Sequence, residues 1–218
     1  MTAIGSPASA SAPALQFSSG ELDTTFGGGD GKVVTDIDSA DNDYATAVAI
    51  QADGKIVVAG YSNGSGTFDF AIARYTTAGA LDTTFGGGDG KVVTDMVSAD
   101  ADYARAISIQ ADGKIVVAGE SNGSGTYDFA LARYTTAGAL DATFGTGGKV
   151  TTNIDSTATD YANALAIQAD GKFVVAGYSN GSGTNDFVVV RYHATNIWKT
   201  PPDPMFILAG TNEISVGW

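Results

Sequence analysis

A long string of residues recurs three times along this chain. A pentapeptide of the form Leu-Asp-x-Thr-Phe begins at Leu22, Leu81 and Leu140, so the repeat has a period of 59 residues. The longest matching strings span residues 43–62, 102–121 and 160–179. A period of this length is too long for a helical solenoid and suits a sheet of several strands. The chain is therefore expected to build three similar sheets.

The first of these strings opens with alternating large and small side chains. Successive side chains of a strand point to opposite faces, so the large set that begins at Tyr44 and the small set that begins at Ala45 define two sides of one strand. Neither side is charged, which predicts a strand held between two neighbouring sheets. Ala52-Asp53-Gly54 then forms a tight turn, because glycine adopts positive φ at low cost. A second strand, rich in β-branched residues, follows.

Four strands are expected in each period, joined by turns rich in Gly, Asn and Asp. The predicted strands are 32–37, 44–51, 55–62 and 68–76 in the first period, 91–96, 103–110, 114–121 and 127–135 in the second, and 149–154, 161–168, 172–179 and 186–193 in the third. No window shows sustained helical periodicity, so the fold class is all-β. Four antiparallel strands, repeated radially, are the plan of a β-propeller blade.

Four strings recur in the repeats: Leu-Asp-Thr-Thr-Phe-Gly, Gly-Lys-Val-Val-Thr, Ile-Gln-Ala-Asp-Gly-Lys-Ile-Val-Val-Ala-Gly and Asp-Phe-Ala-Ile-Ala-Arg-Tyr. Together they resemble the delta-60 repeats of bacterial proteins. The resemblance covers residues 14–193, with repeats at 22–80, 81–139 and 140–197. It implies a propeller-like fold and a secreted or cell-surface protein, and it implies no particular activity.

In such repeats the alanine-rich strand is the innermost one, so a blade begins at Tyr44 and ends with the outer strand at 91–96. With this phase the third blade lacks its outer strand, and residues 32–37 are an outer strand without a blade. Closed propellers have about four to eight blades, and an open fan of three leaves faces and edges uncovered. We therefore predict a homodimer that closes a six-bladed ring, in which residues 32–37 of one chain complete the third blade of the other.

Charge and composition narrow the classes of function. The net charge of −13 argues against electrostatic binding to nucleic acid or to an anionic membrane surface. The chain has no cysteine, which excludes disulfides and zinc–thiolate sites, and no segment approaches the ~18 apolar residues of a membrane helix. Residues 1–13 are interpreted as a flexible linker without the features of a signal peptide, and residues 198–218 as a divergent tail.

Each repeat also contains the Gly-x-Ser-x-Gly pattern of serine esterases, centred on Ser62, Ser121 and Ser179. In those enzymes a helix follows the serine and helps to form the oxyanion hole, whereas here another strand follows. The sole histidine, His193, would complete a triad with Ser179 and Asp186, yet Asp186 and His193 face opposite sides of a regular strand. We interpret the motif as a polar loop, and a carboxylic ester hydrolase is the alternative.

Acidic loops at residues 36–43, 95–102 and 155–160 could supply oxygen ligands for Ca²⁺. They lack the dense Asp-x-Asp-x-Asp-Gly spacing of calcium-binding loops, and turn chemistry explains them equally well. No cofactor is therefore favoured, and Ca²⁺ is the alternative.

Positions that differ among otherwise matching repeats indicate solvated side chains near the mouth of the central channel, where a ring-shaped scaffold is expected to bind its ligand. Two sets qualify: Thr46, Arg105 and Asn163, and Tyr61, Glu120 and Tyr178. In contrast, Asp69 and Arg74 recur in every repeat, which favours a structural ion pair or a hydrogen bond to a neighbouring blade, and Phe26, Phe85 and Phe144 are expected to pack between blades. The sequence thus predicts a non-catalytic binding or interaction module.

Overall fold

The computed structural model describes residues 19–38, 42–64, 66–97 and 100–195. These residues form three antiparallel sheets and no helix, and so contain no helix that could cross a membrane. The strands are β1 (Asp43–Ile50), β2 (Ile56–Ser62), β3 (Asp69–Tyr75) and β4 (Lys91–Thr94) in the first blade, β5 (Asp102–Ile109), β6 (Ile115–Ser121), β7 (Asp128–Tyr134) and β8 (Lys149–Thr152) in the second, and β9 (Asp160–Ile167), β10 (Phe173–Ser179) and β11 (Asp186–Tyr192) in the third.

Each blade is a meander, in which strands adjacent along the chain are hydrogen-bonded neighbours in the sheet. The all-β prediction and the phase of the blades are confirmed, since the first and second blades end with the short strands β4 and β8 and the third has three strands. The strand predicted at residues 32–37 is not formed in the single chain, where this segment has no regular secondary structure. It precedes the first blade, and the described chain offers it no strand with which to pair.

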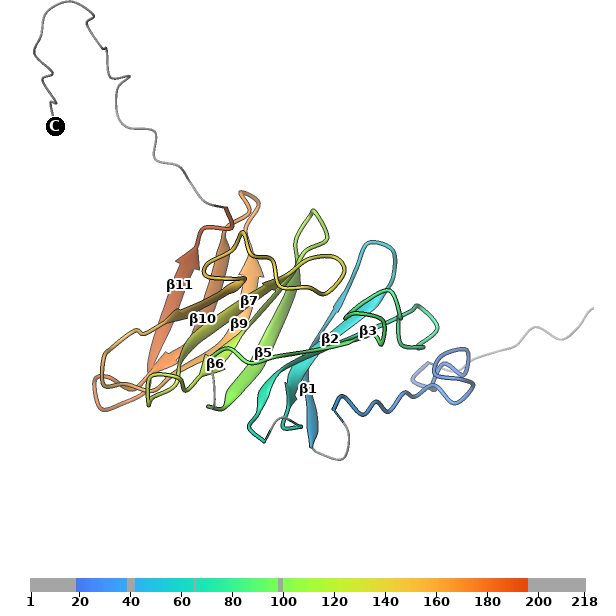
Figure 1. Ribbon diagram of the computed structural model, residues 1–218, viewed down its shortest axis with the longest axis horizontal. Helices are drawn as coiled ribbons and strands as arrows, with labels where there is room; N and C mark the ends of the chain where they lie inside the picture. Colours follow the sequence, from blue (N-terminus) through green and yellow to red (C-terminus); the bar gives the residue numbers. More distant parts are fainter. Residues whose placement is uncertain (1–18, 39–41, 65, 98–99, 196–218) are drawn as a thin grey trace, which may run out of the picture.

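The three blades stack one behind another, as Figure 1 shows, from the third at the left to the first at the right. β5 packs between β1 and β9, so the alanine-rich strands form the narrow side of the stack. An apolar core fills the space between the first two blades, where Phe70 and Ile72 of β3 lie in the same buried cluster as Ile115 and Tyr134 of the second blade.

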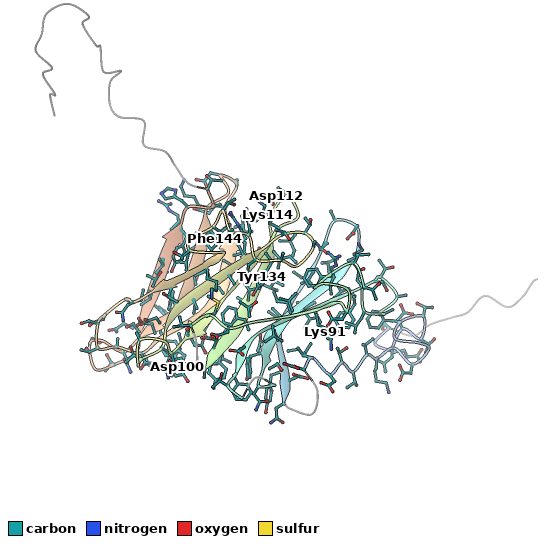
Figure 2. The ribbon with its side chains drawn as sticks, viewed as in Figure 1. Lys91, Asp100, Asp112, Lys114, Tyr134 and Phe144 are labelled. Carbon is teal, nitrogen blue, oxygen red and sulfur yellow. The ribbon has the colours of Figure 1, made fainter. Side chains whose placement is uncertain are left out.

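A second core of the same design joins the second and third blades. Phe129 and Leu131 of β7 lie with Phe173 and Val175 of β10, all fully buried. Phe144 belongs to this core, as Phe85 belongs to the first, which confirms that the phenylalanine of Leu-Asp-x-Thr-Phe packs between blades (Figure 2).

A β-bulge interrupts the pairing of each inner strand with its neighbour. The residues left without a partner are Thr46, Arg105 and Asn163. Tyr44 pairs with Tyr61 and Ala47 pairs with Ala59, so Tyr44 and Ala47 share a face of the sheet. The simple alternation of large and small side chains predicted for this strand is therefore wrong at its start, because the bulge changes the register.

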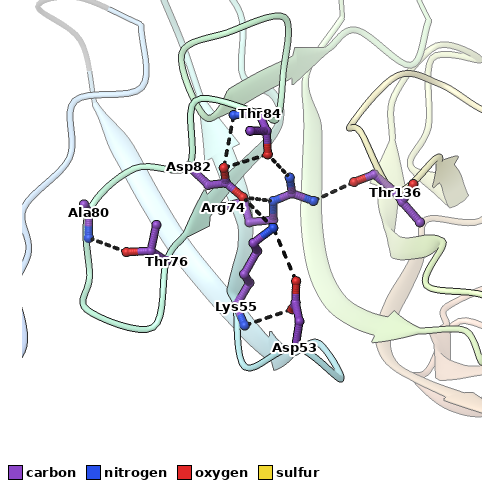
Figure 3. A network of polar contacts seen from close by, with 8 residues as sticks. All are labelled: Asp53, Lys55, Arg74, Thr76, Ala80, Asp82, Thr84 and Thr136. Atoms are coloured by element: carbon purple, nitrogen blue, oxygen red, sulfur yellow. Dashed lines mark hydrogen bonds and ion pairs between the residues drawn. The ribbon is translucent and has the colours of Figure 1, made fainter.

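A buried polar network ties β3 to the Leu81–Phe85 stretch and to the next blade (Figure 3). Arg74 Nε donates to Asp82 Oδ2 at 2.8 Å, and its Nη1 donates to the Thr136 carbonyl of the second blade at 2.5 Å. Lys55 Nζ lies 3.2 Å from the same Asp82 oxygen. The hydrogen bond from Thr84 holds the pKa of Asp82 well below its ordinary value, which keeps the carboxylate charged.

The second blade repeats this network with Arg133, Asp141 and Lys114. The expected contact between the recurring arginine and a neighbouring blade is thus confirmed, since Arg133 donates to the carbonyl of Ala194 in the third blade. Asp69 is not the ion-pair partner of Arg74, because it lies at the opposite end of β3.

Replacing Asp82 with Asn should destabilise the protein by about 3 kcal/mol, because it leaves the buried guanidinium of Arg74 without its countercharge. The matched change Asp53→Asn, at an exposed partner of the same Lys55, should cost much less, because water and salt screen an exposed ion pair. Urea unfolding monitored by circular dichroism compares the two variants. Equal losses of stability would contradict the structural role assigned to Asp82.

Candidate functional site

A continuous strip of aromatic rings crosses one end of the three blades. Each ring centroid lies 4.9–6.0 Å from the next, the spacing of favourable aromatic pairs. The strip consists of Tyr44, Tyr61, Phe68, Tyr103, Tyr127, Tyr161 and Tyr178. These residues lie where the inner strand of each blade begins, where the second strand ends and just before the third strand, so the sheet register brings them together.

An ion pair lies in the middle of this aromatic strip. Arg105 donates from Nε at 2.8 Å and from Nη2 at 2.5 Å to the same oxygen, Oε1 of Glu120. The guanidinium carbon also lies 5.5 Å from the ring centroid of Tyr61 and 5.2 Å from that of Tyr103, within the range of cation–π attraction. Arg105 is the bulged residue of β5, and a bulge re-aims its side chain, which accounts for its reach across these rings.

The two partners of this pair differ in their access to solvent. Glu120 is 0% exposed, whereas the side chain of Arg105 is 32% exposed. Burial raises the pKa of Glu120, against the opposing effect of the hydrogen bonds and the charge of Arg105. A pair with one fully buried charge adds little stability compared with apolar side chains of similar volume. The part of the pair that an incoming molecule can reach is the guanidinium.

The ligand candidates from the sequence fall in or beside this strip. Tyr61 and Tyr178 are two of its rings, and Arg105 and Glu120 form its ion pair. Thr46 and Asn163 occupy the bulges of the other inner strands. The expectation that all six are solvated is wrong for Glu120, which is buried beneath Arg105.

The sequence interpretation missed most of the rings. Tyr44, Tyr103 and Tyr161 occupy one position in the three repeats, and a residue that recurs in every repeat does not stand out from the scaffold. Their positions could have identified them, because each lies two residues before a variable site on the same strand, such as Thr46 or Arg105.

The Gly-x-Ser-x-Gly pattern has a structural explanation in the sheets. A Cβ added to Gly60 would lie 1.7 Å from the carbonyl oxygen of Tyr44, so only glycine fits opposite the bulge. Gly119 and Gly177 make the same close approach. The central serines are buried strand residues that pair with aspartates on both neighbouring strands, as Ser62 does with Asp43 and Asp69. The three serines that occupy this position are Ser62, Ser121 and Ser179.

The structure does not bring the residues of the alternative triad together. Asp186 pairs with Ser179 at one end of β11, whereas His193 follows Tyr192 at the other end. Six residues of extended strand separate these ends, a distance of about 20 Å at ~3.3 Å per residue. His193 is exposed and Ser179 is buried, so no proton transfer between them is possible in this arrangement.

Comparison with known proteins places the repeats in a family. A profile described as "Domain of unknown function (DUF5122) beta-propeller" matches residues 51–85, 110–144 and 168–195. The chain carries three copies of this β-propeller repeat. A search of curated proteins finds no match.

Among solved structures, a fucose lectin from Kordia zhangzhouensis in complex with methyl-fucoside is similar over 68% of this chain and 92% of its own, with 8% identity and a TM-score of 0.38.

Each DUF5122 match begins at the turn between the inner and second strands and continues through the second and third strands of a blade. The first two matches end at Phe85 and Phe144, the phenylalanines packed between blades. Tyr61, Glu120 and Tyr178 therefore lie within the matched repeats, whereas the bulged residues of the inner strands lie outside them. The aromatic strip therefore contains residues from inside and from outside the matched repeats.

The two junctions between blades differ in the number of carboxylates that they bring together. Asp95 and Asp102 converge with Asp69 so that one carboxylate oxygen of each lies within 4.8 Å of the others. At the next junction Asn153 takes the place of Asp95, and its Nδ2 donates to Asp128 Oδ1 at 2.9 Å. The sequence favours no cofactor, and Ca²⁺ at this three-carboxylate cluster stays the untested alternative.

Burial, with the nearby charges of Asp69 and Asp95, raises the pKa of Asp102 to about 6. A carboxyl whose pKa is raised by folding costs stability when it is charged, so this cost applies above pH 6 and disappears as the pH falls towards 4. Replacement of Asp95 by an amide reproduces the arrangement of the next junction and removes one repelling charge.

Asp95→Asn should therefore stabilise the protein at pH 7 by up to about 1 kcal/mol, since Asp95 is exposed and its charge is screened. The gain should shrink at pH 4.5, where Asp102 is protonated. Urea unfolding at the two pH values measures the difference, with Asp89→Asn as the control at an exposed site. A gain of the same size at both pH values would contradict the coupling of Asp95 to Asp102.

Proposed function

We propose that this chain is a non-catalytic binding module that holds a ligand or partner at the aromatic strip. Tyrosine and arginine are the residues that most often dominate binding interfaces, because they offer large flat surfaces with polar ends. The strip presents both in one continuous array, with Tyr44 47% exposed and Arg105 partly open to solvent. A molecule that fits has a flat or apolar group beside an anionic or carbonyl acceptor.

The observation that carries this proposal is the departure of the second blade from the repeat. Arg105 stands where the other blades have Thr46 and Asn163, and Glu120 stands where they have Tyr61 and Tyr178. The first and third blades form the same strands without an ion pair at these positions. The fold therefore does not require the pair, and a buried charge of this kind is retained at a cost to stability.

The proposal includes the assembly in which the strip works. Three blades are fewer than the about four to eight of closed propellers, and two copies of the chain would supply six. In such a homodimer the two aromatic strips would lie around one end of the same ring. A secreted or cell-surface location stays a prediction from the resemblance to delta-60 repeats.

A double variant tests the site without disturbing the blade. Arg105→Thr with Glu120→Tyr gives the second blade the residues of the first, so the fold should be retained, with a melting temperature within about 5 °C of the parent. NMR titration with a library of small aromatic, saccharide and charged fragments should perturb Tyr61, Tyr103 and Arg105 in the parent, and these shifts should be lost in the double variant.

Fragment shifts that cluster elsewhere, or that persist in the double variant, would contradict the site. Hydrolysis of p-nitrophenyl acetate that disappears in Ser179→Ala would contradict the assignment as a non-catalytic module.

A further inference from the structure

Residues 32–37 lie against the first blade in the position of an outer strand from a preceding blade. Tyr75 donates to Thr35 Oγ1 at 2.8 Å, just as Tyr192 of the third blade donates to Thr152 Oγ1 of β8 at 2.9 Å. The Ile37 N–H also donates to Asp43 Oδ2 at 2.8 Å. The same hydrogen bond from a backbone N–H to a carboxylate recurs at both later junctions, where Met96 donates to Asp102 and Ile154 donates to Asp160.

The preceding Leu22–Phe26 stretch is docked in the same way. The Gly27 N–H donates to the Ala78 carbonyl at 3.0 Å, as the Gly86 N–H donates to the Ala137 carbonyl at 3.1 Å one blade later. The ring of Phe26 lies against Gly79, where Phe85 lies against Gly138 in the next repeat. Residues 22–37 are thus the outer part of a blade whose other three strands are absent from the described chain.

The third blade has the complementary deficiency. Within the described residues β11 pairs only with β10, so its other edge carries no strand. Phe187 is 100% exposed and Val189 69% exposed, whereas their counterparts Phe129 and Leu131 are fully buried against the next blade. In the part of the chain that the structure describes, the third blade therefore has an uncovered apolar face, like the face of the first blade that the second blade covers, and a free edge at the place that β4 and β8 occupy in the other two sheets.

The first blade offers the surface that fits this face. A groove of about 430 Å³ lies between residues 31–37 and the open face of the first blade, and Ile56, Val58 and Tyr75 line it. The corresponding residues of the second blade, Ile115, Val117 and Tyr134, are fully buried because the first blade fills the same space. The groove is therefore lined like the surface of the second blade, which packs against a phenylalanine and an aliphatic side chain of the first blade.

The polar network is also incomplete in the third blade. Arg74 and Arg133 each pair with an aspartate of Leu-Asp-x-Thr-Phe, but no such stretch follows Arg191, and Arg191 is exposed. The corresponding aspartate in the first such stretch is Asp23, which accepts the same hydrogen bonds from Thr25 that Asp82 accepts from Thr84. The third blade thus lacks the aspartate-containing stretch that residues 22–26 provide before the first blade.

We infer that residues 22–35 of one copy complete the third blade of a second copy. Residues 32–35 pair with the free edge of β11, Asp23 pairs with Arg191, and the open face of the third blade fills the groove on the first. Figure 1 places β11 and the blue segment at opposite sides of the stack, so the donor cannot be the same chain. This inference rests on the proposed two-copy ring and specifies the strand exchange that closes it.

The repeat fixes the register of the exchanged strand. Ala71 pairs with Val93, and Ala130 pairs with Thr151, in the two complete blades. By the same spacing Val188 of one copy should lie opposite Val34 of the other, with their Cα atoms about 4.5–5.5 Å apart. Val34 is exposed in the single chain. A disulfide can form at this separation without moving the backbone.

The test uses the full chain, which contains no cysteine of its own. On oxidation, Val34→Cys with Val188→Cys should give a covalent dimer on a non-reducing gel, at a yield at least about ten times that of Val34→Cys with Val190→Cys. The control pair lies on the same face but two residues out of register, where the separation exceeds the reach of a disulfide. Light scattering should report two chains per particle for the parent.

The outcomes separate the exchange from the ring. Two chains per particle with equal or no cross-linking in both variants would overturn the strand exchange and leave the two-copy ring in place. One chain per particle at micromolar concentration would overturn both, since the third blade would then be covered by some part of its own chain or not at all.

Discussion

The packing of one sheet face against the next is the interaction on which the rest of this structure depends. Each blade has an apolar side that is covered only when another blade lies behind it, and the two cores between blades hold the largest fully buried side chains. Burial of each Phe or Leu in these layers contributes roughly 1.5–3 kcal/mol. A stack built in this way ends in an open face on each side unless it closes into a ring.

The polar features of the blades follow from the same stacking. The buried arginine of a blade reaches the backbone of the next blade, and its aspartate comes from the stretch that precedes the outer strand. The aromatic strip likewise crosses all three blades, because the start of each inner strand meets its counterpart in the neighbouring blade. A site formed in this way depends on the stack, since no single blade contains more than part of it.

Repetition made most of the fold predictable from the sequence. The strand order follows from a fixed period and from the turn residues between strands, whereas the blade phase and the missing outer strand of the third blade follow from the resemblance to delta-60 repeats, in which the alanine-rich strand is innermost. The bulge at Thr46 was not predictable, because it depends on the partner strand. The burial of Glu120 could not be predicted either, because it follows from an ion pair with Arg105 that only the register reveals.

Hydroxyl-radical footprinting of Phe187 tests most directly the claim that every apolar blade face must be covered by another blade. In the chain alone this ring is fully exposed, while Phe70 and Phe129 are fully buried. The account predicts that at micromolar concentration Phe187 is labelled as slowly as Phe70 and Phe129, and that its protection is lost on dilution as the copies separate. Labelling of Phe187 at the rate of an exposed phenylalanine at every concentration would contradict it.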